Sequence, residues 1–317
     1  MPTTPDRRVR VVVVAWNNRD VLPSCLDHLR ATSWPADQLE VVVVDNGSTD
    51  GSVDDLEARF PGVVVRRNVA NLGFAGGVNT ALGDLDGVWA VALVNSDAFV
   101  EPGWLEPLAA ALEDDPVVGA ASPKILFEAL DAGGRPVINN VGVVLGPTWE
   151  LHDRGYGEVD DGQFDAPEDV WAWCGGAVLL RADYLRDVGL LDSRLFMYAE
   201  DVDLSWRGAK RGWRYRYEPR SVVRHVHGAS SGGERTPLLD YLNRRNRIVV
   251  VGRHAGWPGR IAMAVRVVGG IIAAAGALLP ALRRGRRADP AALRRRVRAA
   301  ADAVRILAGG SPRLPHY

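Results

Sequence analysis

Residues 41–51 read Val-Val-Val-Val-Asp-Asn-Gly-Ser-Thr-Asp-Gly, which predicts a strand that ends near Asp45 and runs into a glycine turn. An unbroken apolar run is typical of a strand that is covered on both faces. Val-rich runs also occupy 9–15, 62–65 and 88–94, and helix-like stretches separate all of them. We therefore predict a doubly wound, mainly parallel α/β sheet, with the second strand at Leu39–Val44.

The composition limits the class of protein. Of 317 residues 47% are hydrophobic, which is enough for one large domain with an appendage or for two modest domains. The two cysteines, Cys25 and Cys174, allow no disulfide framework and no Cys-rich zinc site. The first apolar run stops at Asn17 and is too short for a secretory signal. We expect a protein of the cytoplasm.

Charge is divided unevenly along the chain. The net charge is −1, but Arg235–Tyr317 holds 17 arginines and three acids, or +14, which leaves −15 for residues 1–234. We predict a nucleotide-binding domain at 1–234 and a basic helical region at 235–317. The basic region favours an anionic membrane surface, and no aromatic-basic interleaving supports nucleic acid. A solvated arginine face is the alternative.

The basic region is predicted to be helical over residues 242–308. Its uncharged run, Val267–Leu282, has 16 residues, whereas a spanning helix needs about 20 strongly apolar ones. This length favours an interfacial or packed helix over a transmembrane one. The expected location is the cytoplasm, with peripheral attachment at the inner face of the cell membrane, and the helical surface also suits a homodimer.

Polar residues that follow the strands are candidates for chemistry, because ligands of such sheets bind beyond the carboxyl ends of the strands. Asp45 can accept hydrogen bonds from a base or a ribose. Asn95-Ser96-Asp97 ends another strand, and its carboxylate can hold Mg²⁺ or Mn²⁺. The glycine-rich segment 71–79 lacks a P-loop lysine, although its amides could approach a phosphate. Each segment alone also fits a plain turn or helix entry.

The second half of the chain adds further candidates. Residues 127–170 lack periodicity and are predicted to be irregular, with short strands that could face an acceptor. Glu200-Asp201-Val202-Asp203 begins a predicted helix, where the helix dipole keeps a carboxylate ionised and able to take a proton, although plain capping explains it equally well. His225 and His227 alternate on a predicted strand, so at most one of them should be a metal ligand.

Taken in order, these segments resemble the family-two glycosyltransferases of the GT-A fold, particularly bacterial rhamnosyltransferase-like members. The resemblance covers about Val11 to Asn246. It rests on the ordered occurrence of Val-Val-Val-Val-Ala-Trp-Asn-Asn, Val-Val-Val-Val-Asp-Asn-Gly-Ser-Thr-Asp-Gly-Ser, Asn-Leu-Gly-Phe-Ala-Gly-Gly-Val-Asn, Leu-Val-Asn-Ser-Asp-Ala, Cys-Gly-Gly-Ala-Val-Leu-Leu-Arg, Phe-Met-Tyr-Ala-Glu-Asp-Val-Asp-Leu and Arg-Arg-Asn-Arg.

The resemblance implies a role for each matching position. Asp201 would be the catalytic base with Glu200 in support, and Asp97 would bind a divalent metal, Mg²⁺ or Mn²⁺. His225 would join the metal shell, with His227 as the fallback. Asp45 would bind the nucleobase. The other implied donor-binding residues are Asn17, Asn71, Gly73, Asn79, Asn95, Ser96, Gly175 and Gly176.

Two departures from the family pattern stand out. Asn95 occupies the place of the first acid of the Asp-x-Asp metal motif, which removes one charge from the metal site. Ala15-Trp16-Asn17 replaces a Pro-x-Tyr-Asn-like motif beside the base, so the preferred base is not predicted. Three tryptophans could stack on sugar rings or lie in the core: Trp149, Trp171 and Trp173.

The implied function is inverting transfer of a sugar, with rhamnose as the candidate. The donor would be a nucleotide-diphosphate sugar and the acceptor a carbohydrate or lipid-linked glycan of cell-envelope polysaccharide synthesis. One alternative is a non-catalytic nucleotide-sugar-binding subunit, which the intact Asp97 and Glu200-Asp201 argue against. The other is a sugar nucleotidyltransferase, and residues 11–20 lack the basic glycine-rich loop that such an enzyme would show.

Overall fold

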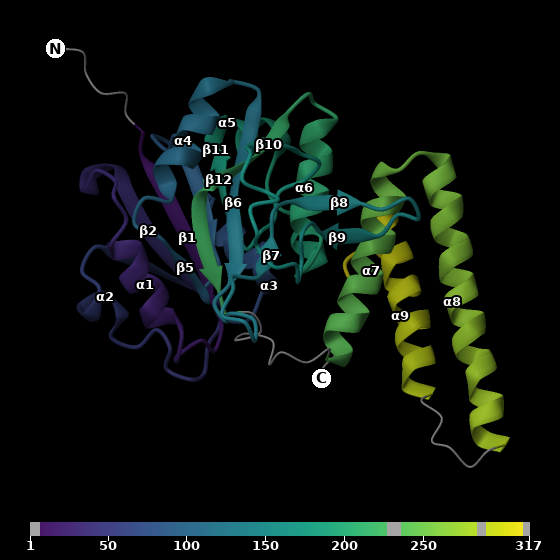
Figure 1. Ribbon diagram of the computed structural model, residues 1–317. Coiled ribbons are helices and arrows are strands. Elements are labelled where there is room, and N and C mark those ends of the chain that lie inside the picture. The colour runs from purple at the N-terminus through teal and green to yellow at the C-terminus, as the bar shows by residue number, and fades with distance from the viewer. Residues whose placement is uncertain (1–6, 227–235, 284–289, 313–317) are drawn as a thin grey trace.

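The computed structural model describes residues 7–226, 236–283 and 290–312, and the side chains of 277–283 lie outside that description. A large twisted sheet has helices on both faces, and three long helices lie beside it (Figure 1). The strand order is β10-β12-β6-β11-β4-β1-β2-β3, with β5 on β12 and β7 on β6. The sheet is mixed, because β11 runs antiparallel to both of its neighbours.

The parallel half of the sheet comes from the valine-rich runs. Val11 and Val13 point into one buried cluster while Val12 points into another, so both faces are covered, as the unbroken apolar runs predict. The last strand starts two residues later than expected. The elements are β1 (Val9–Ala15), α1 (Leu22–Arg30), η1 (Ala36–Gln38), β2 (Leu39–Asp45), α2 (Leu56–Arg59), β3 (Val63–Arg67), α3 (Gly73–Ala81) and β4 (Ala90–Val94).

The second half extends the sheet on the far side of β4. Its middle segment forms only short strands, as the lack of periodicity predicts. The elements are β5 (Ala98–Val100), α4 (Leu105–Asp114), β6 (Val118–Phe127), β7 (Ile138–Asn140), β8 (Val143–Leu145), β9 (Leu151–Asp153), β10 (Glu168–Val170), β11 (Ala177–Arg181), α5 (Ala182–Val188), η2 (Ser193–Leu195), α6 (Glu200–Ala209) and β12 (Arg214–His225).

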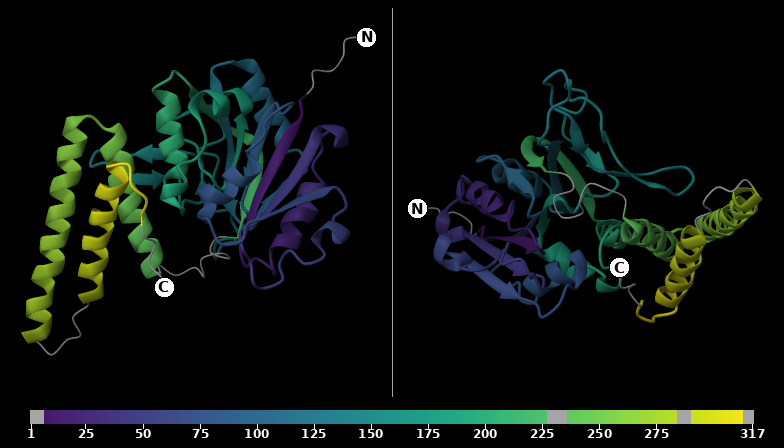
Figure 2. Two further views of the ribbon diagram at one scale, coloured as in Figure 1. Left: turned by 180° about the vertical axis from the view of Figure 1, so that it is seen from behind. Right: turned by 90° about the horizontal axis from the view of Figure 1, so that it is seen from below.

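Three helices follow: α7 (Pro237–His254), α8 (Trp257–Arg283) and α9 (Pro290–Leu307). They confirm the helical prediction and pack side by side in all three views (Figures 1 and 2). Trp206 of α6 stacks on His254 of α7 and on Trp149, so α7 is joined to the sheet domain by an aromatic contact. The boundary at 234/235 stays a prediction.

The tryptophans are largely packing residues. Trp173 is fully buried in the core beneath α5 and α6, and Trp171 meets Trp206 edge to face. Helix α8 contains one stretch, Trp257–Gly276, that is long and apolar enough to cross a membrane by length and composition. This stretch begins ten residues before the predicted run at Val267.

Candidate active site

The candidate residues gather at the carboxyl edge of the sheet. Asp45 is the last residue of β2, in register with Ala15 of β1, and Asp97 follows β4 on the other side of β1. Both are buried, at 8% and 4% exposure. The turn after β2 is closed by the amide of Ser48, which donates to Asp45 Oδ1 at 2.8 Å. The strand order alone therefore brings these two carboxylates to one edge.

Asp97 pairs with the histidine at the end of β12. His225 Nε2 lies 3.0 Å from Asp97 Oδ1 and 3.4 Å from Asn95 Nδ2, and its Nδ1 lies 3.3 Å from Asn139 Oδ1. Asn139 Oδ1 can accept a hydrogen bond from Nδ1–H, and in that tautomer Nε2 could ligate a cation held by Asp97. The other candidate, His227, lies outside the described residues.

This pair has a donor set that suits a hard divalent cation. Asp97 Oδ1 and His225 Nε2 lie 3.0 Å apart and are an oxygen and a nitrogen donor of the kinds that Mg²⁺ or Mn²⁺ could take. The described residues contain no group of three or more His, Cys, Asp or Glu side chains that could hold a metal. Phosphate oxygens and water would therefore have to supply much of the coordination.

Glu200 and Asp201 are the first two residues of α6, and their pKa values are shifted to different extents. Burial and the charge of Asp201 raise the pKa of Glu200 well above its usual range, and Glu200 Oε2 is buried with no partner. Burial also raises the pKa of Asp201, to about 6, against the opposing effect of amides from Gly175 at 3.0 Å and Val202 at 2.7 Å. Because the pKa of Glu200 is raised more strongly, Asp201 is the carboxyl of the pair that ionises first as the pH rises.

The Gly175-Gly176 pair connects the metal side of the edge to Asp201. Gly176 accepts a backbone hydrogen bond from the amide of Asn95 at 3.0 Å, while Gly175 donates to Asp201. A Cβ built on Gly175 would lie 3.3 Å from the ring of Phe74 and 3.6 Å from Asp201 Oδ2. The bare backbone thus lets three segments that are distant in sequence meet at one place.

Asn17 and Asn71 lie in the loops beside Asp45, whereas Asn79 lies within α3. The exposed Asn17, with φ 52°, accepts from the amide of Thr49 at 2.9 Å. Asn71 Oδ1 accepts from the amide of Gly73 at 2.8 Å. Asn79 instead ties α3 to η2, because its amide donates to Leu191 O at 2.8 Å and to Ser193 Oγ at 3.0 Å. Ser96 is buried directly before Asp97.

Gly73 is required by a close approach of two chain segments. Its φ is +74°, and a Cβ there would lie 2.3 Å from the carbonyl oxygen of Phe196. The side chain of Asn46, which sequence reasoning did not single out, fixes this loop. It donates to Asn71 Oδ1 and to Gly73 O, both at 3.0 Å.

The segment before Glu200 has an unusual backbone. Phe196, Tyr198 and Ala199 all have positive φ, at 68°, 73° and 64°. Asn246 of α7, fully buried, donates to the carbonyl oxygens of Leu195, Met197 and Tyr198 at 2.9, 2.8 and 2.7 Å.

Beside Asn246, Arg245 donates to the carbonyl oxygens of Arg194 and Leu195 at 3.1 and 2.7 Å. Helix α7 therefore holds the turn that delivers Glu200 and Asp201. The Arg-Arg-Asn-Arg motif contains both residues, but nothing in its spacing indicates this role.

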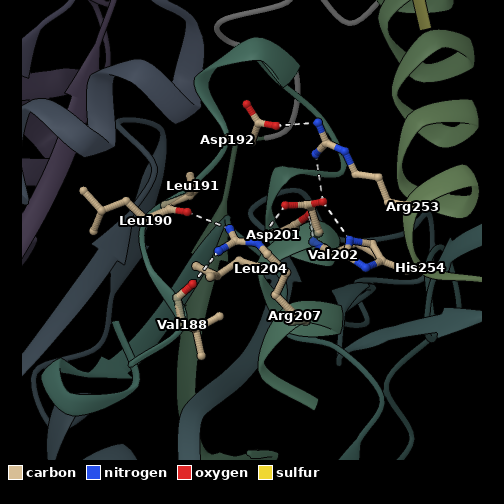
Figure 3. A network of polar contacts seen from close by, with 12 residues as sticks. Val188, Leu190, Leu191, Asp192, Asp201, Val202, Leu204, Arg207, Arg253 and His254 are labelled. Carbon is tan, nitrogen blue, oxygen red and sulfur yellow. Dashed lines mark hydrogen bonds and ion pairs between the residues drawn. The ribbon is translucent and has the colours of Figure 1, made fainter. Parts of the chain in front are cut away.

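Asp203, in the same helical turn, is not available for chemistry. Its side chain is 1% exposed and pairs with Arg207 at 3.0 Å, Arg253 at 3.1 Å and His254 at 2.8 Å. These contacts outweigh burial and lower the pKa of Asp203 to about 2. Figure 3 shows Arg253 and His254 reaching from α7 toward α6. Arg253 also forms an ion pair with Asp192, the residue before η2.

The mixed sheet, with antiparallel β11 between β4 and β6, and the carboxylates at its edge agree with the GT-A fold of glycosyltransferases. A profile of Glycosyl transferase family 2 matches residues 10–142, and one of Glycosyl transferase family group 2 matches residues 90–283. The chain is 30% identical to the N-acetylglucosaminyl-diphospho-decaprenol L-rhamnosyltransferase of Mycobacterium tuberculosis over 69% of this chain and 76% of that protein. The protein belongs to glycosyltransferase family 2.

Other comparisons agree with the fold. The Pre-mycofactocin glycosyltransferase of M. tuberculosis is 31% identical over 77% of this chain and 47% of that protein. A mannosyltransferase from Pyrobaculum calidifontis, solved with GDP-Man and Mn²⁺, aligns over 94% of this chain and 80% of its own with TM-score 0.55 and 21% identity. GalNAc-T7, solved with UDP, GalNAc and Mn²⁺, covers 78% of this chain and 48% of its own, at TM-score 0.60 and 16% identity.

Proposed function

We propose that this glycosyltransferase works with inversion and a divalent metal, and moves an L-rhamnosyl group from a nucleotide-diphosphate donor to a lipid-linked glycan of the cell envelope. The observation that carries the proposal is the ionised Asp201, held by two amides and joined through Gly175-Gly176 to Asn95 beside Asp97. The sugar and the acceptor class are taken from the name of the M. tuberculosis relative.

The chemistry is a single displacement. Asp201 takes the proton of the acceptor hydroxyl while its oxygen forms a bond to the anomeric carbon. The bond from that carbon to the donor diphosphate breaks on the opposite face, and the nucleoside diphosphate leaves with the electron pair. The strongly raised pKa of Glu200 favours a single negative charge on the pair. Asp97 and His225 would hold Mg²⁺ or Mn²⁺, which supplies positive charge beside the leaving group.

The donor pocket is proposed at the ends of β1, β2 and β4. Asp45 and Asn17 would contact the base and ribose, while the Asn71 loop and Ser96 would border the sugar diphosphate. The acceptor class implies work at the cytoplasmic face of a membrane, with peripheral attachment. Dimerisation through the helices stays a prediction, which sedimentation of the purified chain would check.

The test is Asp201→Asn with a labelled nucleoside-diphosphate rhamnose. We expect turnover to fall at least about 100-fold, in line with general-base catalysis, while donor affinity by calorimetry is kept. Asp161→Asn, an exposed loop change, is the matched control. Wild-type activity should rise as pH increases through about 6, because Asp201 must lose its proton to act. Turnover near wild type in Asp201→Asn would remove the base assignment.

The same assay separates the alternatives. A non-catalytic subunit would bind the donor but neither transfer nor hydrolyse it. A nucleotidyltransferase would instead form the nucleotide sugar from a nucleoside triphosphate and a sugar phosphate.

A further inference from the structure

Helix α8 has an apolar surface that the protein leaves exposed. Over Trp257–Gly276 its mean hydropathy is 1.5, only 11% of its most apolar window is buried, and Arg260 and Arg266 are its only charged residues. Within this stretch the large exposed side chains form the α8 stripe, defined as Trp257 (74% exposed), Ile261 (54%), Val265 (66%), Val268 (55%) and Ile272 (64%).

The α8 stripe occupies one face of the helix. Its members are spaced by four, four, three and four residues, which places them along one side. The packed side is different: Met263 is buried with Val251 and Ala255 of the α7 end, and Val267 packs beside it. A continuous apolar stripe of this length is uncommon on a water-facing surface and marks an interaction site.

The positive charge on the side of α8 opposite the stripe favours an anionic partner. Helix α9 packs along α8, and a Cβ on Gly270 would lie 2.9 Å from Arg296 Nη1. This helix carries five arginines, at positions 294, 295, 296, 298 and 305, against the single acid Asp302. Gly270 lies on the side of α8 opposite the stripe, so α9 stands behind α8 and its arginines would face the headgroups above an inserted stripe. Anionic lipid headgroups would neutralise the same charge.

The packing favours a helix that lies in the interface over one that spans the bilayer. Arg266 of α8 forms an ion pair with Glu150, and Met263 is anchored to α7. A spanning α8 would carry this ion pair, together with the arginines of α9, into hydrocarbon, where such charges are costly. An interfacial helix buries one apolar side and keeps its charged neighbours among the headgroups.

We propose that α8 docks the protein on an anionic lipid bilayer, with the α8 stripe in the acyl boundary and the arginines of α9 at the headgroups. The inference deepens the proposed function, because a lipid-linked acceptor resides at that surface. Docking itself requires no catalysis, so it is measured independently of transfer.

The experiment is flotation of the full chain with vesicles. We expect it to float with phosphatidylcholine–phosphatidylglycerol vesicles, and at least tenfold less with pure phosphatidylcholine. Salt at about 1 M shortens the Debye length to about 3 Å and should release most of the protein from the anionic vesicles. The triple variant Ile261→Ser/Val265→Ser/Ile272→Ser should lose at least tenfold in vesicle affinity.

Controls separate docking from folding and from catalysis. Val117→Ser/Leu130→Ser changes two residues that are 44% and 53% exposed elsewhere and should float like wild type. Asp201→Asn should also float normally. The triple variant should keep its thermal unfolding temperature and its donor hydrolysis.

Several results would overturn the proposal. They are absence of wild-type flotation, equal flotation with neutral vesicles, salt-resistant extraction that needs detergent, or a triple variant that binds like wild type. A dimer that the triple variant dissociates, with no vesicle binding, would assign the stripe to a second copy instead.

Discussion

The contact between Asn246 and the turn before Glu200 leads to a specific prediction for Asn246→Ala. The change removes the side chain whose amide donates to the carbonyl oxygens of Leu195, Met197 and Tyr198. It also removes the oxygen that accepts from Arg245 Nε of α7 at 2.8 Å. Because Asn246 is fully buried, water cannot readily replace the lost donor.

The magnitude follows from the backbone. Each of the three non-glycine residues with positive φ stores about 1 to 2 kcal/mol. The carbonyl oxygen of Leu195 keeps its bond from Arg245, and a buried carbonyl that loses its donor costs about 1 to 3 kcal/mol. The turn can relieve the backbone strain and the lost hydrogen bonds by relaxing. Because Asp201 follows the turn by two residues, this relaxation would displace Asp201. A shift of about 1 Å can lower a rate by about 100-fold. We expect kcat to fall about 10- to 100-fold and the free energy of unfolding to fall by about 2 to 4 kcal/mol.

The assay is steady-state transfer with donor and acceptor varied in turn, together with urea unfolding. The KM for donor should change by less than about threefold, because the interactions that bind the donor equally in the ground state and the transition state are unaffected. The control, Asn243→Ala, alters an exposed residue one turn away whose amide contacts only Leu239 O among the described bonds. A less stable Asn246→Ala whose folded fraction keeps wild-type kcat and pH profile would show a purely structural role and refute the reasoning.

Three further outcomes are expected. Asp97→Ala should abolish the Mn²⁺ dependence of donor binding in calorimetry, and equal donor affinity in both proteins, with and without Mn²⁺, would exclude a metal role. Gly73→Ala should destabilise by more than about 2 kcal/mol in urea unfolding, because of the positive φ and the 2.3 Å approach to Phe196. Asp203→Asn should lower the unfolding free energy by about 3 to 5 kcal/mol, since it leaves buried cations unpaired. Because the pKa of Asp203 is lowered to about 2, its ionisation adds about 2 kcal/mol to the free energy of unfolding above pH 4, and this stability is lost as the pH falls through 2. If the mutant lost stability between pH 4 and pH 2 as the wild type does, this account would be contradicted.

The sequence determined much of the fold, because its signals are local. Four valine-rich runs without alternation indicate strands covered on both faces, and each forms a parallel strand within two residues of its predicted bounds. The glycine at position 47, with φ +76°, marks the turn after Asp45. The antiparallel insertion of β11 was not predicted, because the direction of a strand leaves no mark in its own composition.

The sequence by itself also indicated which groups are candidates for the chemistry, since carboxylates and amides at strand ends are readable in order along the chain. Tertiary structure alone decided which of them share an environment. It raises the pKa of Glu200 by burial more than that of Asp201, pairs Asp203 with Arg253 and His254, and sets His225 against Asp97 across 128 positions of sequence. The physical reason is that desolvation and pairing depend on neighbours that are distant in sequence, as when α7 supplies Asn246 to the turn before the base.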